Sequence, residues 1–443
     1  MATKASTTRH ETVRDTARLE QALVVLGLAL LIAAASELIG TVKIPVGAAS
    51  VSIFPMVWGI IIASIVSIQK VKPLPVRLQQ IAATLVGVFV LVLVARLAFN
   101  IGPNLQTVLN AGPALLLQEV GHLLGTIVLA LPLAVALKMG PATIGATFSI
   151  DREPSFAMVQ EKYGPDSDQY RGVLAMYVFG TLFGAVFISL LSSVISSLKI
   201  FDPLALAMGA GVGSGSMMAA ATASIVQHYP EAQSEVLGIA AVSNLITTIF
   251  GVYVGIWIAL PLADKLYRAL AGRRARAAEQ ADAETNRALR EEIAKSAAPV
   301  HLPLWIALPA LTVIGLVTAS IVAKGFKIEI LWGYLVLDAL VLLSIGFNRL
   351  FRPLSAIVWI TTIGAAVSSP WSPIGKQLVA WVTAVDFLSI ATVILTLAGL
   401  GLGKDIPLLK QIGWKIIPVG LVAITASFIL ATIIAEFTLG FWG

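Results

Sequence analysis

Long apolar segments are the feature of this sequence that most limits what it can fold into. Many run for 18 residues or more, and at about 1.5 Å of rise per residue such a helix spans the roughly 30 Å hydrocarbon core of a bilayer. Only 12% of the 443 residues are charged, against about a quarter in soluble globular proteins. The sequence therefore predicts an all-α, polytopic membrane protein. The apolar segments lie at about 21–39, 50–68, 79–98, 112–138, 171–198, 233–261, 303–322, 328–347, 353–369, 379–402 and 412–440.

Two further apolar segments, 139–160 and 202–228, are interrupted by glycine, proline, serine and charged residues. Each of them either crosses the membrane or enters and returns, which gives 11 to 13 membrane segments in total. Four clear spans separate the basic loop 69–78 from the basic segment 263–301. An even number of crossings must separate two loops on one side, so the two broken segments must both cross or both re-enter.

The Lys and Arg residues predict the orientation, because basic residues in short loops stay cytoplasmic. They gather in 1–20, 69–78, 263–301, 349–352 and 404–415. All of these lie on one side if the N-terminus is cytoplasmic and the C-terminus external, in a multi-pass protein of the cell inner membrane. The net charge of +6 is then a topology signal, and nucleic acid is not an expected partner.

The predicted organisation has four parts. Residues 1–20 form a cytoplasmic N-terminal segment, 21–262 an N-terminal membrane half, 263–301 a cytoplasmic charged helical linker, and 302–443 a C-terminal membrane half. The chain has no cysteine, which excludes disulfides, thiolate catalysis and cysteine-ligated metals.

The run of glycines and serines from 208 to 216 is the strongest candidate binding feature. Four glycines within seven residues open the backbone, Ser214 and Ser216 add hydroxyls, and a half-helix is predicted to begin at about 217. Freed backbone groups and the positive end of a half-helix suit an anionic solute. The alternative is close helix packing through small residues. The predicted binding residues here are Gly211, Gly213, Ser214, Gly215, Ser216 and Asn244.

The other broken segment supplies a second group of candidates. Thr147 and Ser149 offer hydroxyls, Arg152 can pair a solute carboxylate, and Asp151 can bind a cation or carry a proton. Charges at membrane depth are rare and are usually functional. A solvated loop between two shorter elements is the equal alternative.

The two broken segments also resemble each other. A shift of 67 positions places Thr147 and Ser149 on Ser214 and Ser216. A parallel repeat of this kind requires that both segments cross the membrane, and chance similarity between two alanine-rich stretches is the alternative.

Three isolated carboxylates lie within predicted spans. Glu119 stands three residues before His122, a spacing seen in carboxylate-bridged metal sites, but too few histidines accompany them, and no metal or other cofactor is expected. A proton relay, a solute contact and an interfacial helix end stay open for Glu119. Asp338 and Asp386 are predicted mid-span, where coupling to H⁺ or Na⁺ is the default hypothesis.

With these residues in hand, the chain resembles elevator-type secondary carriers: the bile acid–sodium symporter-like families, the lysine exporters and the 2-hydroxycarboxylate carriers. GAGVGSGSMMA looks like their glycine-rich discontinuous segments, and LTLAGLGLGKDIPLLKQIGWKIIPVGLVAI looks like the closing helix pair of related bacterial inner-membrane families. The resemblance implies a scaffold domain, a mobile transport domain and a solute site where discontinuous helices meet. Only positions 209–216 carry over to this chain, residues 151–153 depart from the pattern, and the families' Na⁺ ligands have no match.

The sequence thus predicts a secondary active transporter for a small solute, an organic anion or amino acid, moved by elevator-like alternating access coupled to H⁺ or Na⁺. The solute is expected between 139–155 and 208–217. A channel or structural membrane subunit is the alternative, and a membrane-embedded enzyme a weaker one, since no H-E-x-x-H or G-x-S-x-G motif and no P-loop is present. The sequence leaves open whether the chain forms a homodimer.

Overall fold

The computed structural model describes residues 2–46, 49–148, 155, 159, 162–163, 167–272, 300, 302–351, 356–405 and 413–442. In this part of the chain, seven helices are long and apolar enough to cross a membrane. They are Leu19–Ile39, Val76–Ile101, Gly112–Ala136, Leu304–Val322, Ile328–Leu350, Phe387–Lys404 and Ile416–Gly440. The prediction of an all-α polytopic membrane protein is confirmed.

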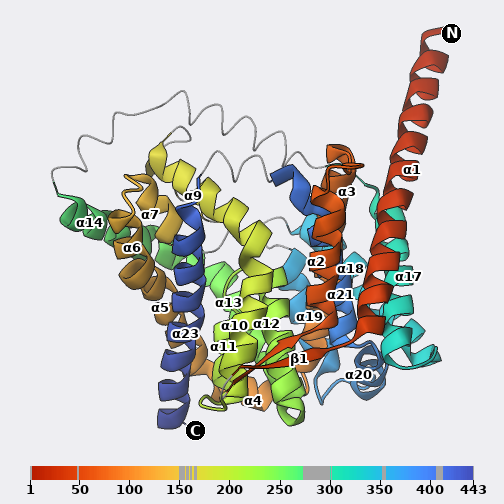
Figure 1. Cartoon of the computed structure of the whole chain (residues 1–443). Coiled ribbons are helices and arrows are strands. Elements are labelled where there is room, and N and C mark those ends of the chain that lie inside the picture. The colour runs from red at the N-terminus through yellow and green to blue at the C-terminus, as the bar shows by residue number, and fades with distance from the viewer. Residues whose placement is uncertain are drawn as a thin grey trace.

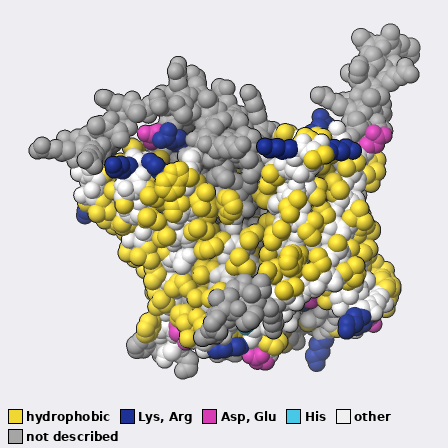
Figure 2. All heavy atoms as spheres, in the orientation of Figure 1, with side chains coloured by type: hydrophobic (Ala, Val, Ile, Leu, Met, Phe, Trp, Pro, Cys, Tyr) yellow, Lys and Arg dark blue, Asp and Glu magenta, His cyan; other side chains and the backbone are white. Residues whose placement is uncertain are grey.

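The surface has the layering that a bilayer requires. Hydrophobic side chains form a broad belt around the middle of the visible face, and Lys, Arg, Asp and Glu gather at its upper and lower rims (Figure 2). The N-terminus projects beyond the upper rim and the C-terminus lies at the lower end (Figure 1). The helix axes run mainly between these two rims, so they cross the apolar belt.

One bundle combines helices from the two ends of the sequence, with α1, α2 and α3 packed against α17 to α21. Small residues allow the close approach, as membrane helix interfaces generally require. Gly59 lies against Thr396 and Gly333 against the Trp381 carbonyl. The members are α1 (Ala2–Ile39), α2 (Pro55–Ile68), α3 (Val76–Ile101), α17 (Leu304–Val322), α18 (Ile328–Leu350), α19 (Ala356–Ser368), α20 (Gly375–Ala384), α21 (Phe387–Gly401) and the 3₁₀ turn η5 (Leu402–Asp405).

The second bundle combines the middle of the chain with the last helix, α23. Gly121 and Gly125 face the α23 backbone at Leu430 and Ala426, which explains how closely α5 and α23 pack. The members are α4 (Leu105–Asn110), α5 (Gly112–Gly125), η1 (Thr126–Ala130), α6 (Leu131–Ala136), α7 (Ala142–Thr147), α9 (Asp168–Phe179), η2 (Gly180–Gly184), α10 (Ala185–Ser197), α11 (Pro203–Ala210), α12 (Gly215–His228), η3 (Pro230–Ala232), α13 (Gln233–Val254), η4 (Gly255–Ala259), α14 (Leu260–Ala271) and α23 (Ile416–Trp442).

The two bundles meet where α3 packs against α13 and α12 packs against α21. Helices from both predicted membrane halves therefore contribute to each bundle. Three of the long helices in the second bundle contain a π-helical turn, at η1, η2 and η4. Such π-turns inside α-helices occur frequently at functional sites.

A short antiparallel hairpin replaces part of one predicted span. Strands β1 (Val42–Val46) and β2 (Ala49–Ile53) pair with Val42 opposite Ile53 and Ile44 opposite Val51. The segment 50–68 was expected to be one helix, but α2 begins only at Pro55. The alternation of β-branched residues in VKIPV and ASVSI is typical of strands. A hydropathy profile averages over neighbouring residues and therefore does not detect this alternation.

Candidate functional site

The segment 202–228 folds as a hairpin of two helices, α11 and α12. Its two ends lie together: the Tyr229 hydroxyl donates to the Phe201 carbonyl at 3.0 Å, and Lys199 Nζ donates to the His228 carbonyl. The α12 arm runs parallel to α10, and the two helices are joined by bonds from Ser224 and Ser192. The segment therefore enters and leaves at the same end of the molecule.

This geometry decides between crossing and re-entry. The parallel repeat at 67 residues required that both broken segments cross, and the hairpin shows that this expectation was wrong. The parity argument then requires that the chain between α6 and α9 also begins and ends at one side. Within that stretch the described helix is α7, and residues 149–154 lie outside the described part.

The tip of the hairpin is the glycine–serine break between α11 and α12. Gly213 has a φ of +87°, a left-handed conformation that glycine adopts without strain. Gly211 is buried, and a Cβ there would collide with Ser243 of α13. Gly209, in the last turn of α11, faces Phe428 and Thr432 in the middle of α23. The tip thus lies deep within the bundle, and its glycines are needed for both backbone shape and close packing.

Two side chains of α13 hold the opened backbone. Asn244 Nδ2 donates to the carbonyl oxygens of Gly211, at 2.7 Å, and Gly213, at 3.0 Å. Ser243 Oγ donates to the Met208 carbonyl at 2.8 Å. Unpaired backbone groups in an apolar interior cost several kcal/mol, so a broken helix needs such partners. The structure places Asn244 at the break, as predicted, and there it bonds the backbone.

The hydroxyls at the tip mark the start of α12. Ser214 is the N-cap, and its Oγ accepts a bond from the Met217 amide at 3.4 Å. Ser216 Oγ lies 3.1 Å from Ser214 Oγ. Residues 214–216 are half-buried, while Gly211 and Gly213 are buried. The tip therefore offers two hydroxyls at the positive end of a 14-residue helix.

Glu119 belongs to a buried polar cluster one turn along α13 from Asn244. The Thr247 hydroxyl donates to Glu119 Oε1, and Gln118 Nε2 donates to the same oxygen at 2.7 Å. On the next turn of α5, His122 Nδ1 bonds Ser427 of α23. Glu119 and His122 are 5% and 0% exposed, so the interfacial helix end weighed for Glu119 does not fit. The structure brings Glu119 to the helix that holds the hairpin tip.

Thr147, which is the described member of the second group of predicted residues, is not brought to this tip. Thr147 is fully buried on α7, where its hydroxyl donates to the Thr143 carbonyl at 2.7 Å. Helix α7 packs on α9, α6, α14 and α23, and not on the α11–α12 pair. Residues 139–148 and the glycine run therefore do not form a shared site. Ser149, Asp151 and Arg152 lie outside the described residues.

A second break lies between α20 and α21, where a single span was expected over 379–402. At the start of α20, Gly375 lies by Ser369, and the adjacent Ser368 contacts Gly102 just after the end of α3. At the end of α21, Gly401 lies by Gln79, near the start of α3. Helices α20 and α21 together therefore run the length of α3. Asp386 is extended, with φ −64° and ψ 128°, and its Oδ1 accepts a bond from the Ser389 amide at 2.8 Å. Asp386 is therefore the N-cap of α21, and the single unbroken helix expected over 379–402 was wrong.

Arg96 reaches this break from α3. It is only 3% exposed, and its Nε donates to the Val385 carbonyl at 2.9 Å. Asp386 lies close enough for the two charges to interact. Within the described part of the chain this is the one hydrogen bond of the Arg96 side chain, although a guanidinium carries five N–H donors.

Three more polar groups surround the α20–α21 break. Asp338 Oδ2 accepts a bond from Thr312 of α17 at 2.8 Å. Tyr334 is fully buried beside Gly315, within range of Asp338 and Asp386. On α1, Glu37 interacts with Thr392 and Asp386. The second cluster thus joins α1, α3, α17, α18 and α21, and it contains both mid-molecule aspartates that the sequence singled out.

Sequence reasoning missed Arg96, Glu37 and Tyr334. The signal was present for the first two, because each is a lone charge within an apolar segment, in VARLAF and ASELIG. Among the described residues no three His, Asp or Glu side chains converge as a metal ion would need. The acidic groups here are spread along the break instead.

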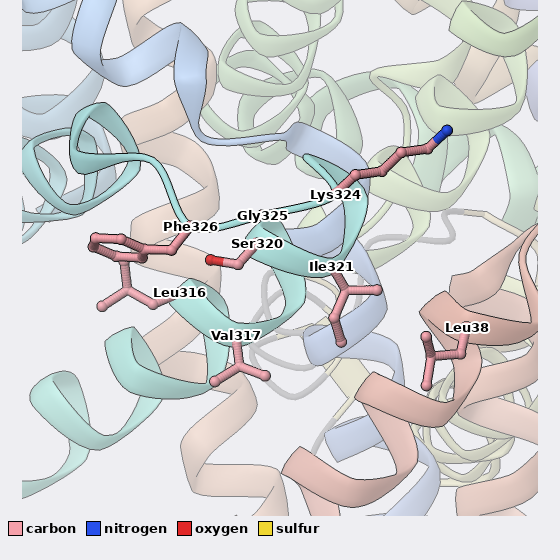
Figure 3. Close-up of a pocket in the computed structure, with 8 residues that line it drawn as sticks. All are labelled: Leu38, Leu316, Val317, Ser320, Ile321, Lys324, Gly325 and Phe326. Carbon is pink, nitrogen blue, oxygen red and sulfur yellow. The ribbon is translucent and has the colours of Figure 1, made fainter.

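A surface groove of about 570 Å³ lies where α17 and α1 end (Figure 3). Leu38, Leu316 and Phe326 give it apolar walls, and Ser320 and Lys324 are its polar members. It contains none of the predicted site residues, so it does not compete with the two breaks as a solute site.

Comparison with known proteins gives a family and no function. No curated protein and no solved structure matches the chain. A family model described as "Protein of unknown function (DUF3100)" matches residues 34–269, more than half of the chain. The match contains Glu37, Arg96 and the hairpin tip, and it ends before Asp338 and Asp386. This polytopic membrane protein is therefore a member of the DUF3100 family.

Proposed function

We propose that this protein is a secondary active transporter that binds a small solute at the tip of the α11–α12 hairpin. The observation that carries the proposal is the break at Gly211–Ser214 inside a bundle of membrane helices. A helix broken at that depth exposes backbone groups at a cost, and carriers use such breaks to hold solutes and ions. Asn244 offsets part of that cost by bonding two of the freed carbonyls.

The chemistry of the tip favours a solute with a negatively charged group. The start of α12 carries a partial positive charge, and Ser214 and Ser216 supply two hydroxyl donors beside it. A carboxylate of an organic acid or an amino acid fits these donors. The Glu119 cluster stands close to the tip along α13 and is suited to an amino group or a proton.

The two-bundle arrangement supports an elevator-like mechanism. The hairpin, α5, α13 and α23 belong to one bundle, whereas α1 to α3 and α17 to α21 form the other. If the bundle with the hairpin carries the solute and the bundle of α1 to α3 and α17 to α21 stays fixed, the α3–α13 and α12–α21 contacts are the sliding surface. The expected orientation places the N-terminus in the cytoplasm of a cell whose inner membrane holds the protein.

The test combines binding and flux. The purified protein is screened by thermal shift against organic acids and amino acids, and each stabilising compound is then tested for uptake into proteoliposomes. Ser214→Ala and Ser216→Ala should weaken binding of any stabilising compound. Ser197→Ala is the matched control, since that half-buried serine lies on α10 and bonds the Val194 carbonyl of its own helix.

The alternatives give different results in the same assays. Saturable, gradient-driven uptake supports a carrier, and ionic conductance without saturation supports a channel. Binding that is equally strong in the two tip variants and in the Ser197 control would remove the tip from the site. A membrane-embedded enzyme would be indicated if a stabilising compound were chemically changed.

A further inference from the structure

We propose that Glu37 and Asp338 exchange protons with water and so make H⁺ the coupling ion of this protein. Arg96 and Asp386 form the fixed opposite charges between them, at the α20–α21 break. The coupling role rests on the proposed transport function, whereas the proton exchange itself does not. Each exchange moves one proton from a hydronium ion to a carboxylate oxygen and leaves water.

The charges around the break do not balance if every acid is ionised. Glu37, Asp338 and Asp386 would contribute three negative charges, and Arg96 is the basic side chain that the described residues place among them. Asp386 has the Arg96 charge and the Ser389 amide as partners. Glu37 and Asp338 have neither a cation within ion-pair distance nor a helix N-terminus of their own in the described structure.

The hydrogen bonding of the two acids indicates the same imbalance. Asp338 bonds Thr312 through Oδ2, while its Oδ1 is buried and has no hydrogen-bond partner. Glu37 Oε1 is likewise buried without a partner. An ionised carboxylate with an unsatisfied oxygen in an apolar interior is far more costly than a neutral carboxyl group. Both side chains are therefore placed to accept a proton.

The neighbouring donors can accept further hydrogen-bond partners. The Tyr334 hydroxyl is fully buried, and Ser389, Asp338 and Asp386 lie within range of it. Arg96 is 3% exposed and uses one of its N–H groups, on Val385. Buried polar groups are normally satisfied, and bound water commonly supplies the missing bonds. Water between these groups would give protons a path to the carboxylates.

The spacing of the acids favours a proton over a metal cation. A metal ion needs several oxygen ligands around one point, and no such convergence of acids occurs among the described residues. The other groups facing the break are hydroxyls: Thr312 from α17, and Ser389 and Thr392 from α21. A single carboxyl beside a single hydroxyl is enough to hold a proton.

Infrared spectroscopy of the full-length protein in vesicles tests this without a solute. Protonated carboxyl groups absorb in a C=O band that ionised ones lack, and that band shifts in D₂O. The wild type should show the band at neutral pH and lose it as the pH is raised. Glu37→Gln and Asp338→Asn should each lose part of the band, and the double variant should lose both parts. Glu231→Gln, an exposed acid in the η3 turn, should match the wild type.

Two outcomes would overturn the proposal: a wild-type spectrum with no protonated-carboxyl band at neutral pH, or a double variant whose band equals that of the wild type. A band that disappears when Na⁺ replaces K⁺ at constant pH would also overturn it, in favour of sodium. The wild-type titration does not depend on whether the variants fold. If no solute is ever transported but the band titrates as described, the transport function fails and the proton exchange stands.

Discussion

Arg96 donates a hydrogen bond to the carbonyl oxygen of Val385, so a side chain of α3 closes the backbone gap between α20 and α21. The two residues are 289 positions apart in the sequence. The bond joins the first third of the chain to the last third, and the Arg96 side chain that makes it is buried.

Replacing Arg96 with Met should destabilise the protein by about 1.5–3 kcal/mol, because hydrogen bonds from charged groups contribute about that much. The change leaves the Val385 carbonyl without its donor and Asp386 without its countercharge. Equilibrium unfolding in mixed micelles measures the effect. Arg349→Met, at an exposed position near the end of α18, should be close to neutral, and equal losses in both variants would contradict the role given to Arg96.

Asp386 is expected to act first as a helix cap. Asp386→Ala should lose about 0.5–2 kcal/mol, the usual loss for removing an N-cap side chain. Asp386→Ser keeps an oxygen for the Ser389 amide and should recover most of that stability while removing the charge. If Ser is as destabilising as Ala in the same unfolding assay, the charge beside Arg96 matters more than the cap.

Gly213→Ala should be destabilising by about 1–2 kcal/mol, since non-glycine residues meet that penalty in the left-handed region. The control is Gly87→Ala in α3, where a Cβ has open space and helical geometry. That change should be neutral or stabilising because alanine favours helices. Thermal unfolding of the two variants side by side checks the contrast, and a stable Gly213→Ala protein would show that the tip adopts another backbone shape.

Asn244→Ala should loosen the tip of the hairpin more than the rest of the bundle. Two buried carbonyls lose their donor, at about 1–3 kcal/mol for each unsatisfied group. Hydrogen–deuterium exchange of peptides containing 208–217 should increase, while peptides from α3 stay protected. Asn110→Ala, in an exposed asparagine that bonds Gln106, is the matched control. Unchanged exchange at the tip would mean that Asn244 does not hold the break closed.

Tyr229 should make the base of the hairpin sensitive to alkali. Burial, with Asp202 and Glu436 nearby, raises the pKa of Tyr229 above its ordinary value. The folded state thus favours the neutral phenol, which donates to the Phe201 carbonyl. Its contribution is complete below the unfolded pKa, about 10, and is lost as the pH rises through the higher folded pKa. Tyr229→Phe should remove that part of the alkaline loss in a thermal melt, and an identical pH profile would exclude it.

The sequence predicted the membrane class and the main break because both depend on local composition. The length of the apolar segments predicts the membrane spans. Glycines at every second position, as in 209–215, predict an interrupted helix. The same local reasoning located Asp338 and Asp386 as unusual residues, and both lie in one buried cluster.

What could not be predicted depends on contacts between distant residues. Segment 202–228 enters and leaves at the same end, as the hydrogen bonds from Lys199 to His228 and from Tyr229 to Phe201 show. A hydropathy profile cannot predict such bonds. The break before α21 contains no glycine. It consists of the extended residues Val385 and Asp386, and Asp386 caps α21, so the amino-acid composition did not indicate a broken helix there. The role of Arg96 follows from a partner 289 residues away.

The hairpin also has a consequence for how this fold can change over time. A segment that enters and leaves at one end adds no net pass through the bilayer, so its insertion, loss or exchange leaves every later helix pointing the same way. A single crossing helix gained or lost would instead invert the remainder of the chain. Evolution or protein engineering can therefore replace the α11–α12 hairpin without inverting the membrane orientation of the helices that follow it.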